Sequence, residues 1–400
     1  MRMWTLLIVV GLACGAPNVG NPNNAVNHFS FGLLHNTYQF QESFGTKNVA
    51  VAPLSVWSLF SLLTEGSSGQ TFSELLNVLG LPNDLRATQN LHLSVKDILK
   101  HNSRDVTLIG QSAMFSDCSL EIHPEFCRSA NLCSTDVYSV DPSNTTKLAG
   151  DINYYICTAT EGKIINAVKP QNLDNLRMVL VDALYFKANW THPFDPTHTK
   201  QADFQNSQGR TIGRVNMMYH KAPHRHADVE EIGAQVLEMT YGSDARYSML
   251  LLLPYEGMPI KQLLENLASK PTERKPHWLT TFLSEEEHNV DTYVPRFFMS
   301  AQSDLIRPMQ YTGIVSIFDP QRAELPGVST SPLFVSSTVQ NVELEVTEEG
   351  TVAAAATIAG LEDRILGPRF EANREFVFLI LERSAGIVLF AGVYSEPSVV

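Results

Sequence analysis

Three histidines lie close enough together in the sequence to ligate one metal ion: His220, His224 and His226. Imidazole nitrogen is a common zinc ligand, and short spacings between histidines are typical of zinc sites. The residues between and beside them include lysine, proline and arginine, which are typical of an exposed turn. The two interpretations are therefore a metal site and a solvated hairpin, and the flanking residues favour the hairpin. We expect neither a bound metal nor a cofactor.

Short motifs that carry catalytic groups are absent from the sequence. It has no G-x-S-x-G nucleophile elbow, no Walker loop, no G-x-G-x-x-G, no H-E-x-x-H and no paired C-x-x-C. Gly162-Lys163-Ile164 lacks the preceding glycine of a Walker loop and the hydroxyl residue that would hold magnesium. Because no nucleophile constellation supports a hydrolase, we expect a protein that is not an enzyme.

A segment near the C-terminus contains no catalytic motif, but its composition is unusual. From Gly350 to Leu361 the chain contains neither a charged residue nor a proline, and it includes four consecutive alanines. Alanine is the best helix former, whereas the threonines, valine and isoleucine of the segment favour a strand. Composition alone leaves three alternatives open, namely an alanine-rich helix, a flexible loop and a latent strand.

The periodicity of apolar residues predicts the elements that must position these groups. Between residues 27 and 81 the apolar spacing is three and four, and prolines and glycines at 53, 66–69 and 80–82 separate the expected helices. We expect strands at 105–115, 177–186, 234–253 and 339–346, with helical segments near 150–160 and 260–268. The last strand alternates apolar and acidic residues, as one buried face requires: Val342, Glu343, Leu344, Glu345 and Val346. The mixture predicts an α+β fold with mainly antiparallel sheets.

Size and charge limit the classes of partner. The 400 residues are 44% hydrophobic and 18% charged, which is enough material for a large core. Length alone favours two or three domains, but no linker, repeat or low-complexity tract divides the chain. Twenty-nine basic and 42 acidic residues give a net charge of −13 without a basic cluster. We therefore expect neither nucleic acid nor a membrane as a partner.

The first 15 residues predict a secretory signal peptide. A basic start precedes an apolar run that is too short to cross a bilayer, and Ala13-Cys14-Gly15 supplies the small residues that precede a cleavage site. The mature chain would begin near Ala16. The alternative is a buried N-terminal helix. We expect a secreted, extracellular protein.

Cysteines and glycosylation motifs agree with export but do not define the fold. Four cysteines remain after cleavage, too few for a disulfide scaffold, so we expect one disulfide at most, with free buried thiols as the alternative: Cys118, Cys127, Cys133 and Cys157. Two sequons make Asn144 and Asn189 glycan acceptors if they are exposed.

Several motifs, in order along the chain, resemble those of the serpin family of serine protease inhibitors. Residues 348–357, E-E-G-T-V-A-A-A-A-T, resemble the hinge of inhibitory serpins. Residues 48–55 resemble the N-x-x-x-S-P-x-S motif, residues 160–164 match T-x-G-K-I, and residues 182–190 are similar to N-A-x-Y-F-K-G-x-W. Residues 376–380 and 386–392 resemble the closing signature of the family. These landmarks span about residues 27–397.

The resemblance implies a fold. It is a single serpin domain over residues 16–400, with a large mixed central β-sheet, additional sheets, about nine helices and an exposed reactive-centre loop at residues 348–370. In this family the loop is offered to a protease as bait. The usual family spacing, fourteen residues after Gly350, places the scissile bond between Arg364 and Ile365, and counting back from Phe376 gives the same bond.

The resemblance also implies a mechanism. An arginine before the scissile bond suits the primary pocket of a trypsin-like serine protease, whose serine would form an ester with Arg364. Insertion of the cut loop into the central sheet would then trap the ester in a covalent one-to-one complex. The hinge that enters the sheet consists of Glu348, Glu349, Gly350, Thr351, Val352, Ala353, Ala354, Ala355, Ala356 and Thr357. The residues on one face of it, from Thr351 onward, are all small, as a buried strand requires.

The chain departs from the family pattern at the shutter, the place where the central sheet opens. The usual serine, asparagine and histidine map onto Ala52, Asp182 and Gln340, while Ser55 is retained. Ionised Asp182 can only accept hydrogen bonds, so it needs donors such as the Gln340 amide or the Ser55 hydroxyl. We group Trp190, at the end of the same motif as Asp182, with this shutter and breach region.

The loop sequence suggests which proteases could be targets. Glu362-Asp363 should discourage ordinary trypsin-like digestion and favour a protease with basic neighbouring subsites. Arg364-Ile365-Leu366-Gly367 resembles the R-I-x-G activation site of protease zymogens. One hypothesis is therefore a target in an extracellular protease cascade, and the other is coincidence.

The alternative function is that of a non-inhibitory serpin, a carrier, chaperone or storage protein whose loop is cut without trapping. The clean hinge favours inhibition. A glycosaminoglycan cofactor is not expected, because residues 83–102 carry few basic groups: Arg86, His92, Lys96, Lys100 and His101. We expect a monomer.

Overall fold

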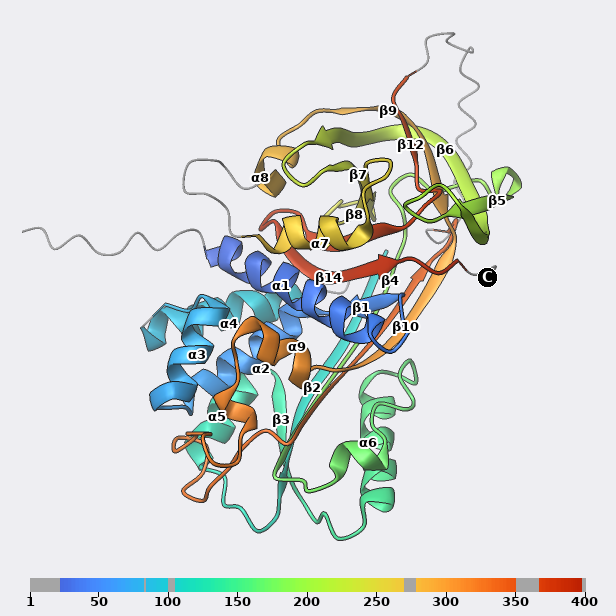
Figure 1. The fold of residues 1–400 in the computed structure, drawn as a ribbon. Coiled ribbons are helices and arrows are strands. Elements are labelled where there is room, and N and C mark those ends of the chain that lie inside the picture. The colour runs from blue at the N-terminus through green and yellow to red at the C-terminus, as the bar shows by residue number, and fades with distance from the viewer. Residues whose placement is uncertain (1–21, 83, 100–104, 270–277, 350–366, 398–400) are drawn as a thin grey trace, which may run out of the picture.

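Two β-sheets organise the computed structural model, which describes residues 22–82, 84–99, 105–269, 278–349 and 367–397 (Figure 1). One sheet has five strands in the order β10-β11-β4-β2-β3. Antiparallel and parallel pairs alternate across it, so it is the large mixed sheet that was expected. Its strands are β2 (Val106–Asp117), β3 (Thr135–Val140), β4 (Met178–Ala188), β10 (Phe297–Asp304) and β11 (Ser337–Val346).

The second sheet has nine strands and curves over one end of the first (Figure 1). Its main path is β1-β14-β13-β8-β7-β6-β9-β12, and β5 pairs with β6. The strands are β1 (Val49–Val51), β5 (Lys200–Gln205), β6 (Thr211–Val229), β7 (Ala234–Tyr241), β8 (Tyr247–Pro254), β9 (Glu287–Pro295), β12 (Arg369–Glu371), β13 (Phe376–Glu382) and β14 (Ile387–Tyr394).

Nine α-helices lie within the described residues, in agreement with the expected number. They are α1 (Pro22–Glu42), α2 (Pro53–Glu65), α3 (Gly69–Leu79), α4 (Leu85–Leu99), α5 (Pro124–Leu132), α6 (Thr145–Ala159), α7 (Ile260–Ala268), α8 (Trp278–Phe282) and α9 (Ile306–Thr312). Short 3-10 helices occur at Pro170–Leu173, Pro196–His198 and Ser316–Phe318. None of the helices in these ranges has the length and apolar character needed to cross a membrane.

Helices cover both faces of strand β4, which explains why it is apolar on both sides. Val179 and Val181 pack with α6 on one face, whereas Leu180 and Leu184 belong to the main core, with α2, on the other. Residues 53–64 of α2 are all buried, because the helix runs between the two sheets instead of along the surface. Pro53 starts this helix at a position where the missing N–H has no helical partner in any case.

The structure confirms most of the elements expected from periodicity and corrects two. The expected strand at 234–253 is a hairpin of β7 and β8, with left-handed residues at Gly242 and Ala245 in the turn. The exposed turn expected around the three histidines is wrong. All three lie within strand β6, and His220 and His224 are buried, because the basic residues that suggested a turn alternate with them along a strand.

Candidate functional site

The two ends of the expected reactive-centre loop come from different sheets. Strand β11 of the five-stranded sheet ends at Val346, and β12 of the nine-stranded sheet begins at Arg369 and pairs in parallel with β9. Most of the predicted hinge, from Gly350 to Thr357, and the predicted scissile residues Arg364 and Ile365 lie outside the described residues. The site is therefore built from the residues that hold the two ends and the neighbouring strands.

The first residues after β11 are held by a set of contacts that we name the hinge anchor: Trp190, Phe194, Thr199 and Arg296 around Thr347 and Glu348. The Trp190 indole donates to the Thr347 carbonyl at 2.9 Å, and the Phe194 amide donates to the Glu348 carbonyl at 3.2 Å. Trp190 itself is fixed by stacking on Tyr241, with ring centroids 4.3 Å apart.

The Glu348 carboxylate is buried inside the hinge anchor, whereas its neighbour Glu349 is exposed. Glu348 accepts a hydrogen bond from the Thr199 hydroxyl at 2.7 Å, and its second oxygen lies 3.5 Å from the Arg296 guanidinium. Sequence reasoning missed Phe194, Thr199 and Arg296. They are far from residue 348 in the chain, and nothing in their local pattern distinguishes them.

A second set of contacts, the Asp182 cluster, joins the two central strands to α2. It consists of Ala52, Ser55, Ser112, Asp182 and Gln340. Gln340 on β11 and Asp182 on β4 are directly paired in the parallel register. The Gln340 amide donates to Asp182 Oδ2 at 2.7 Å, the Ser55 hydroxyl lies 2.5 Å from the same oxygen, and the Ser112 hydroxyl donates to Oδ1 at 2.7 Å.

Gln340 is saturated in this cluster, which fixes the orientation of its amide. Its oxygen accepts from the Ala52 N–H at 2.9 Å, and its nitrogen donates both to the Ala52 carbonyl at 3.0 Å and to Asp182. The structure thus brings together Ala52, Ser55, Asp182 and Gln340, as expected, and adds Ser112. Trp190, the remaining member of the predicted shutter and breach group, lies in the hinge anchor.

The electrostatic balance of Asp182 is set by its complete burial. Loss of hydration raises the pKa of the Asp182 carboxyl above its usual value, and the hydrogen bonds from Ser55, Gln340 and Ser112 oppose that rise. Burial of the ionised carboxylate therefore costs free energy, and the hydrogen bonds from the three donors offset part of that cost. Any separation of β11 from β4 removes the Gln340 donor from Asp182.

The buried histidines form a pair behind the hinge anchor. The Nε2 atoms of His220 and His224 lie 2.8 Å apart, and Phe194 stacks on His220 with ring centroids 3.9 Å apart. Burial lowers the pKa of His220 to about 4 and that of His224 to about 3. Both rings are therefore neutral near pH 7. Within the part of the chain that the structure describes, no group of three or more His, Cys, Asp or Glu is arranged to hold a metal ion.

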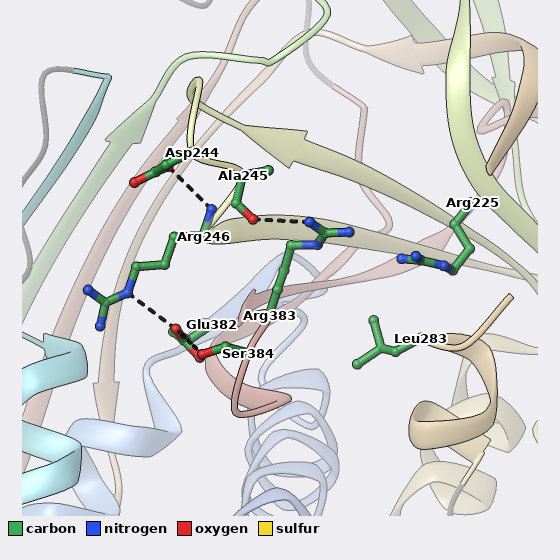
Figure 2. A pocket seen from close by; sticks show the side chains of 8 residues that line it. All are labelled: Arg225, Asp244, Ala245, Arg246, Leu283, Glu382, Arg383 and Ser384. Atoms are coloured by element: carbon green, nitrogen blue, oxygen red, sulfur yellow. Dashed lines mark hydrogen bonds and ion pairs between the residues drawn. The ribbon is translucent and has the colours of Figure 1, made fainter. Parts of the chain in front are cut away.

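An open pocket of about 540 Å³ lies beside the turn between β7 and β8 (Figure 2). Three arginines line it, and each is paired with a carboxylate: Arg225 and Arg383 with Glu238, and Arg246 with Glu382. Because these pairs neutralise its charge, the pocket does not present a free anion site.

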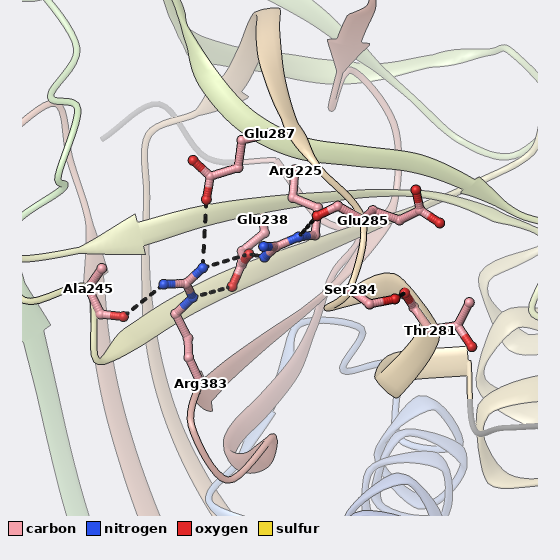
Figure 3. A network of polar contacts seen from close by, with 8 residues as sticks. All are labelled: Arg225, Glu238, Ala245, Thr281, Ser284, Glu285, Glu287 and Arg383. Atoms are coloured by element: carbon pink, nitrogen blue, oxygen red, sulfur yellow. Dashed lines mark hydrogen bonds and ion pairs between the residues drawn. The ribbon is translucent and has the colours of Figure 1, made fainter.

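The network behind this pocket is structural (Figure 3). Glu238 on β7 is buried between Arg225 and Arg383, and the Arg225 guanidinium also donates to the Glu285 carbonyl at 2.6 Å. Arg383 adds a bond to the Ala245 carbonyl at 3.1 Å and a contact with Glu287 at 3.7 Å. The network ties the turn after β13 to β6, to β7 and to the residues after α8.

The remaining predicted positions are on the surface or partly buried. Asn144 is exposed and caps α6 by accepting from the Lys147 N–H at 2.9 Å, while Asn189 is half-buried. Within the described residues, no disulfide joins any of the four cysteines. Cys118 is exposed and the other three are half-buried, so none is the fully buried thiol of the alternative interpretation. His92, one of the few basic groups considered for a glycosaminoglycan site, is buried.

Comparisons with known proteins agree with this geometry. The family profile described as "Serpin (serine protease inhibitor)" matches residues 24–397. Serpin A3-1 of Bos taurus is 32% identical over 360 residues, which cover 88% of this chain and 84% of the bovine protein.

Solved structures are similar over nearly the whole chain. Serpin48 of the insect Tenebrio molitor, described as a highly specific serpin, has a TM-score of 0.79 at 25% identity, covering 95% of this chain and 99% of its own. Human thyroxine-binding globulin has a TM-score of 0.78 at 26% identity, covering 95% and 100%. The two-sheet α+β fold, with β11 of one sheet followed along the chain by β12 of the other, is the fold of these serpins. The chain belongs to the serpin family of serine protease inhibitors.

Proposed function

We propose that this chain is a secreted inhibitor of a trypsin-like serine protease, which it traps as a covalent acyl-enzyme after cleavage between Arg364 and Ile365. The observation that carries the proposal is the position of the hinge. The clean segment that begins at Gly350 follows directly on β11, and β11 is paired in parallel with β4.

The topology of the central sheet supports insertion between these two strands. A segment that turns back after β11 runs antiparallel to β11. Because β4 is parallel to β11, the same segment is also antiparallel to β4. Insertion would thus replace one parallel pair with two antiparallel pairs, which are slightly more stable per residue.

Both the energy and the distance are adequate for trapping. If each new backbone hydrogen bond contributes roughly 0.5–1.5 kcal/mol, a strand with a dozen of them supplies about 10 kcal/mol. Fourteen inserted residues at about 3.3 Å each would carry the attached protease about 45 Å. Distortion that removes even one donor from the oxyanion hole slows hydrolysis by roughly 10²–10³-fold, so the ester would persist.

The residues at the scissile bond define the target class. Arg364 requires a protease with a carboxylate at the floor of its primary pocket. The acidic residues Glu362 and Asp363 favour basic neighbouring subsites. The likeness of Arg364-Ile365-Leu366-Gly367 to a zymogen activation site supports a protease that activates others in an extracellular cascade. Inhibition of digestive trypsin-like enzymes alone would contradict that narrower assignment.

Secretion belongs to the same proposal. Residues 1–15 would be removed as a signal peptide, leaving one serpin domain over residues 16–400 that acts as a monomer without cofactor. The exposed Asn144 would carry a glycan more readily than the half-buried Asn189. Mass spectrometry of the protein recovered from a secreting host tests the cleavage site and both sequons.

The deciding experiment mixes the protein with trypsin and looks for a complex of one protease and one inhibitor that survives SDS. We expect such a complex, with the new N-terminus of the released peptide at Ile365. A loop cut at this bond without a stable complex would eliminate the proposal.

Two variants separate recognition from trapping. Thr351→Arg should still be cut at Arg364 but should form no complex, because a charged side chain cannot enter the buried face of the sheet. Arg364→Ala should lose recognition by trypsin while keeping its fold.

The alternative is a non-inhibitory serpin. Human thyroxine-binding globulin has the same fold and is named for a small molecule that it binds, so the fold alone does not establish inhibition. The small, uncharged residues from Thr351 to Ala356 favour the inhibitor, and the trypsin experiment distinguishes the two.

A further inference from the structure

Three helices meet at a cluster of polar side chains that protease inhibition does not use. Ser61 and Glu65 lie one turn apart on α2, His92 lies on α4, and Cys133 is the residue at which α5 ends. His92 is buried, and its ring packs edge-on against Trp57 with centroids 6.1 Å apart. We name these four residues the Cys133 cluster.

The two ring nitrogens of His92 have different partners. Nε2 faces the Ser61 hydroxyl in a short contact, while Nδ1 lies 3.2 Å from the Cys133 sulfur and 3.5 Å from a Glu65 carboxylate oxygen. The Ser61 hydroxyl has a single hydrogen, which it donates to the Ser58 carbonyl at 2.9 Å. In the tautomer in which Nε2 carries the ring proton, His92 donates to the Ser61 oxygen and Nδ1 is an acceptor.

This tautomer leaves Nδ1 as a base that points at a thiol. A nucleophile within hydrogen-bond reach of a base, with the base held by a further group, is the arrangement that activates cysteine. Proton transfer from Cys133 to Nδ1 gives a thiolate and an imidazolium, and the Glu65 carboxylate stabilises the imidazolium. The C-terminal end of α5 disfavours a thiolate, and the adjacent imidazolium offsets that effect.

Cys133 is more exposed than the residues beside it in the cluster. It is half-buried and follows Leu132, which is 58% exposed, whereas His92 and Ser61 are buried. Cys127 and Cys157 are half-buried as well, but among the described residues neither has an imidazole within hydrogen-bond reach. The reaction rates of Cys127 and Cys157 therefore show how fast a half-buried thiol reacts without a neighbouring histidine.

We propose that Cys133 is a thiol-modification site that reacts with small disulfides, with His92 as its base. The Cys133 thiolate attacks one sulfur of the disulfide, a new S–S bond forms, and the original S–S bond breaks. The departing thiolate takes up the proton held on His92 and leaves as a thiol. Cys133 is oxidised to a mixed disulfide and the departing half is reduced, so no further oxidant is required.

The test uses the full mature protein in its native form, with oxidised glutathione as the probe at pH 7. Peptide mass spectrometry after timed quenching gives the modification rate of each cysteine in the same molecules. We expect Cys133 to react at least about tenfold faster than Cys127 and Cys157, because an unassisted thiol is only a few per cent ionised at this pH. Equal rates at the three positions would overturn the proposal, as would a disulfide that joins Cys133 to another cysteine in the protein as isolated.

Two variants check the role of His92. His92→Phe keeps an aromatic ring beside Trp57 and removes the base, and it should lower the Cys133 rate about tenfold without changing Cys127 or Cys157. Glu65→Gln keeps His92 and the shape of the side chain, and it should lower only the Cys133 rate, by a smaller factor. If His92→Phe does not fold, Glu65→Gln decides alone. An unchanged Cys133 rate in a folded variant contradicts the assignment. The outcome is independent of whether the protein inhibits a protease.

Discussion

At the residue scale, the Asp182 cluster is unusual because it holds a carboxyl group that is completely buried. A fully buried carboxylate is held by two hydroxyls and one amide, and no cation from the described part of the chain contacts it. Such a site exchanges the hydration of a charge for hydrogen bonds of fixed geometry. The cost depends on whether Asp182 is ionised, so the stability of the closed sheet should depend on pH at this one residue.

Asp182→Asn should make the native form more resistant to urea. The variant keeps an oxygen for the Gln340 amide and offers an N–H to the Ser112 oxygen, while it buries no charge. Burial raises the pKa of Asp182 in the folded state above its ordinary 3.8, so wild-type stability falls as pH rises from about 4 toward the folded-state value. The advantage of the variant should grow over that window, by at most about 1.4 kcal/mol per pH unit. Urea midpoints measured from pH 4 to 8 test this.

Asp182→Ala is the matched control. It removes the acceptor and leaves the Gln340 and Ser112 donors buried without a partner, which should destabilise the native form by about 1–3 kcal/mol. An asparagine variant that is as unstable as the alanine variant would show that the charge itself holds the cluster together.

The His220–His224 pair predicts loss of stability in acid. Burial lowers the pKa of the two imidazoles to about 4 and about 3, whereas the unfolded chain titrates near 6.5. The unfolded state therefore binds more protons between these values, so stability should fall as pH drops from about 6.5 to about 4. Each ring contributes at most about 1.4 kcal/mol per pH unit. In the His224→Gln variant, the urea midpoint should change less between pH 7 and pH 5 than in the wild type. The same change in both proteins would contradict this assignment.

At the scale of elements, the hinge anchor determines how β11 leaves the central sheet. The carbonyls of Thr347 and Glu348 are bonded to Trp190 and Phe194, on the segment that follows β4. That segment packs in turn on His220 of β6, so the start of the loop rests on both sheets at once. Thr347 and Glu348 are therefore held by other elements, through their own carbonyls and through the Glu348 carboxylate.

Glu348→Lys should weaken this anchor strongly. The substitution places a cation beside Arg296 in a buried site and removes the acceptor of the Thr199 hydroxyl. Loss of one partner from a buried ion pair costs roughly 3–5 kcal/mol, and we expect a lower urea midpoint of the native form by about that amount. Glu349→Lys is the control, because Glu349 is exposed and should change stability by less than about 0.5 kcal/mol. Similar midpoints for the two variants would mean that Glu348 does not anchor the hinge.

At the scale of the whole molecule, the two sheets are joined through residues 350–366, which connect β11 to β12. While that connection is intact, its two ends are held in different sheets, and the central sheet has five strands. Cleavage at Arg364 would free one end from this constraint. Under the proposed function the intact protein is kinetically trapped and the cut protein reaches a more stable state.

Cleavage between Arg364 and Ile365 should accordingly raise the melting temperature. A gain of about 10 kcal/mol corresponds to roughly 12 °C in a chain of this size, whose unfolding entropy is about 0.8 kcal/mol per kelvin. Calorimetry of the intact and cut protein measures it, and the cut Thr351→Arg variant should show no gain. If the cut wild-type protein melts at the same temperature as the intact one, the loop does not insert, and the carrier or storage function becomes the better explanation.

The sequence by itself determined the family, most of the elements and the composition of the hinge. These depend on local patterns, namely the spacing of apolar residues, the position of Pro53, and the motifs at residues 48–55, 160–164 and 182–190. Two of the three donors of Asp182, Gln340 and Ser55, could be named in advance, because the family motifs place them beside it and an ionised carboxylate only accepts hydrogen bonds. The motif at 182–190 did not reveal that the Trp190 indole bonds to the Thr347 carbonyl.

Only the tertiary structure decided which polar residues are buried and which groups they contact. Ser112, Thr199 and Arg296 look like ordinary polar positions in the sequence, and the histidines of β6 look like those of a surface turn. Their roles come from strands that pair across more than a hundred residues of chain, such as β11 with β4. Burial and partners are properties of that packing, because a side chain has the same local sequence whether it meets water or another strand.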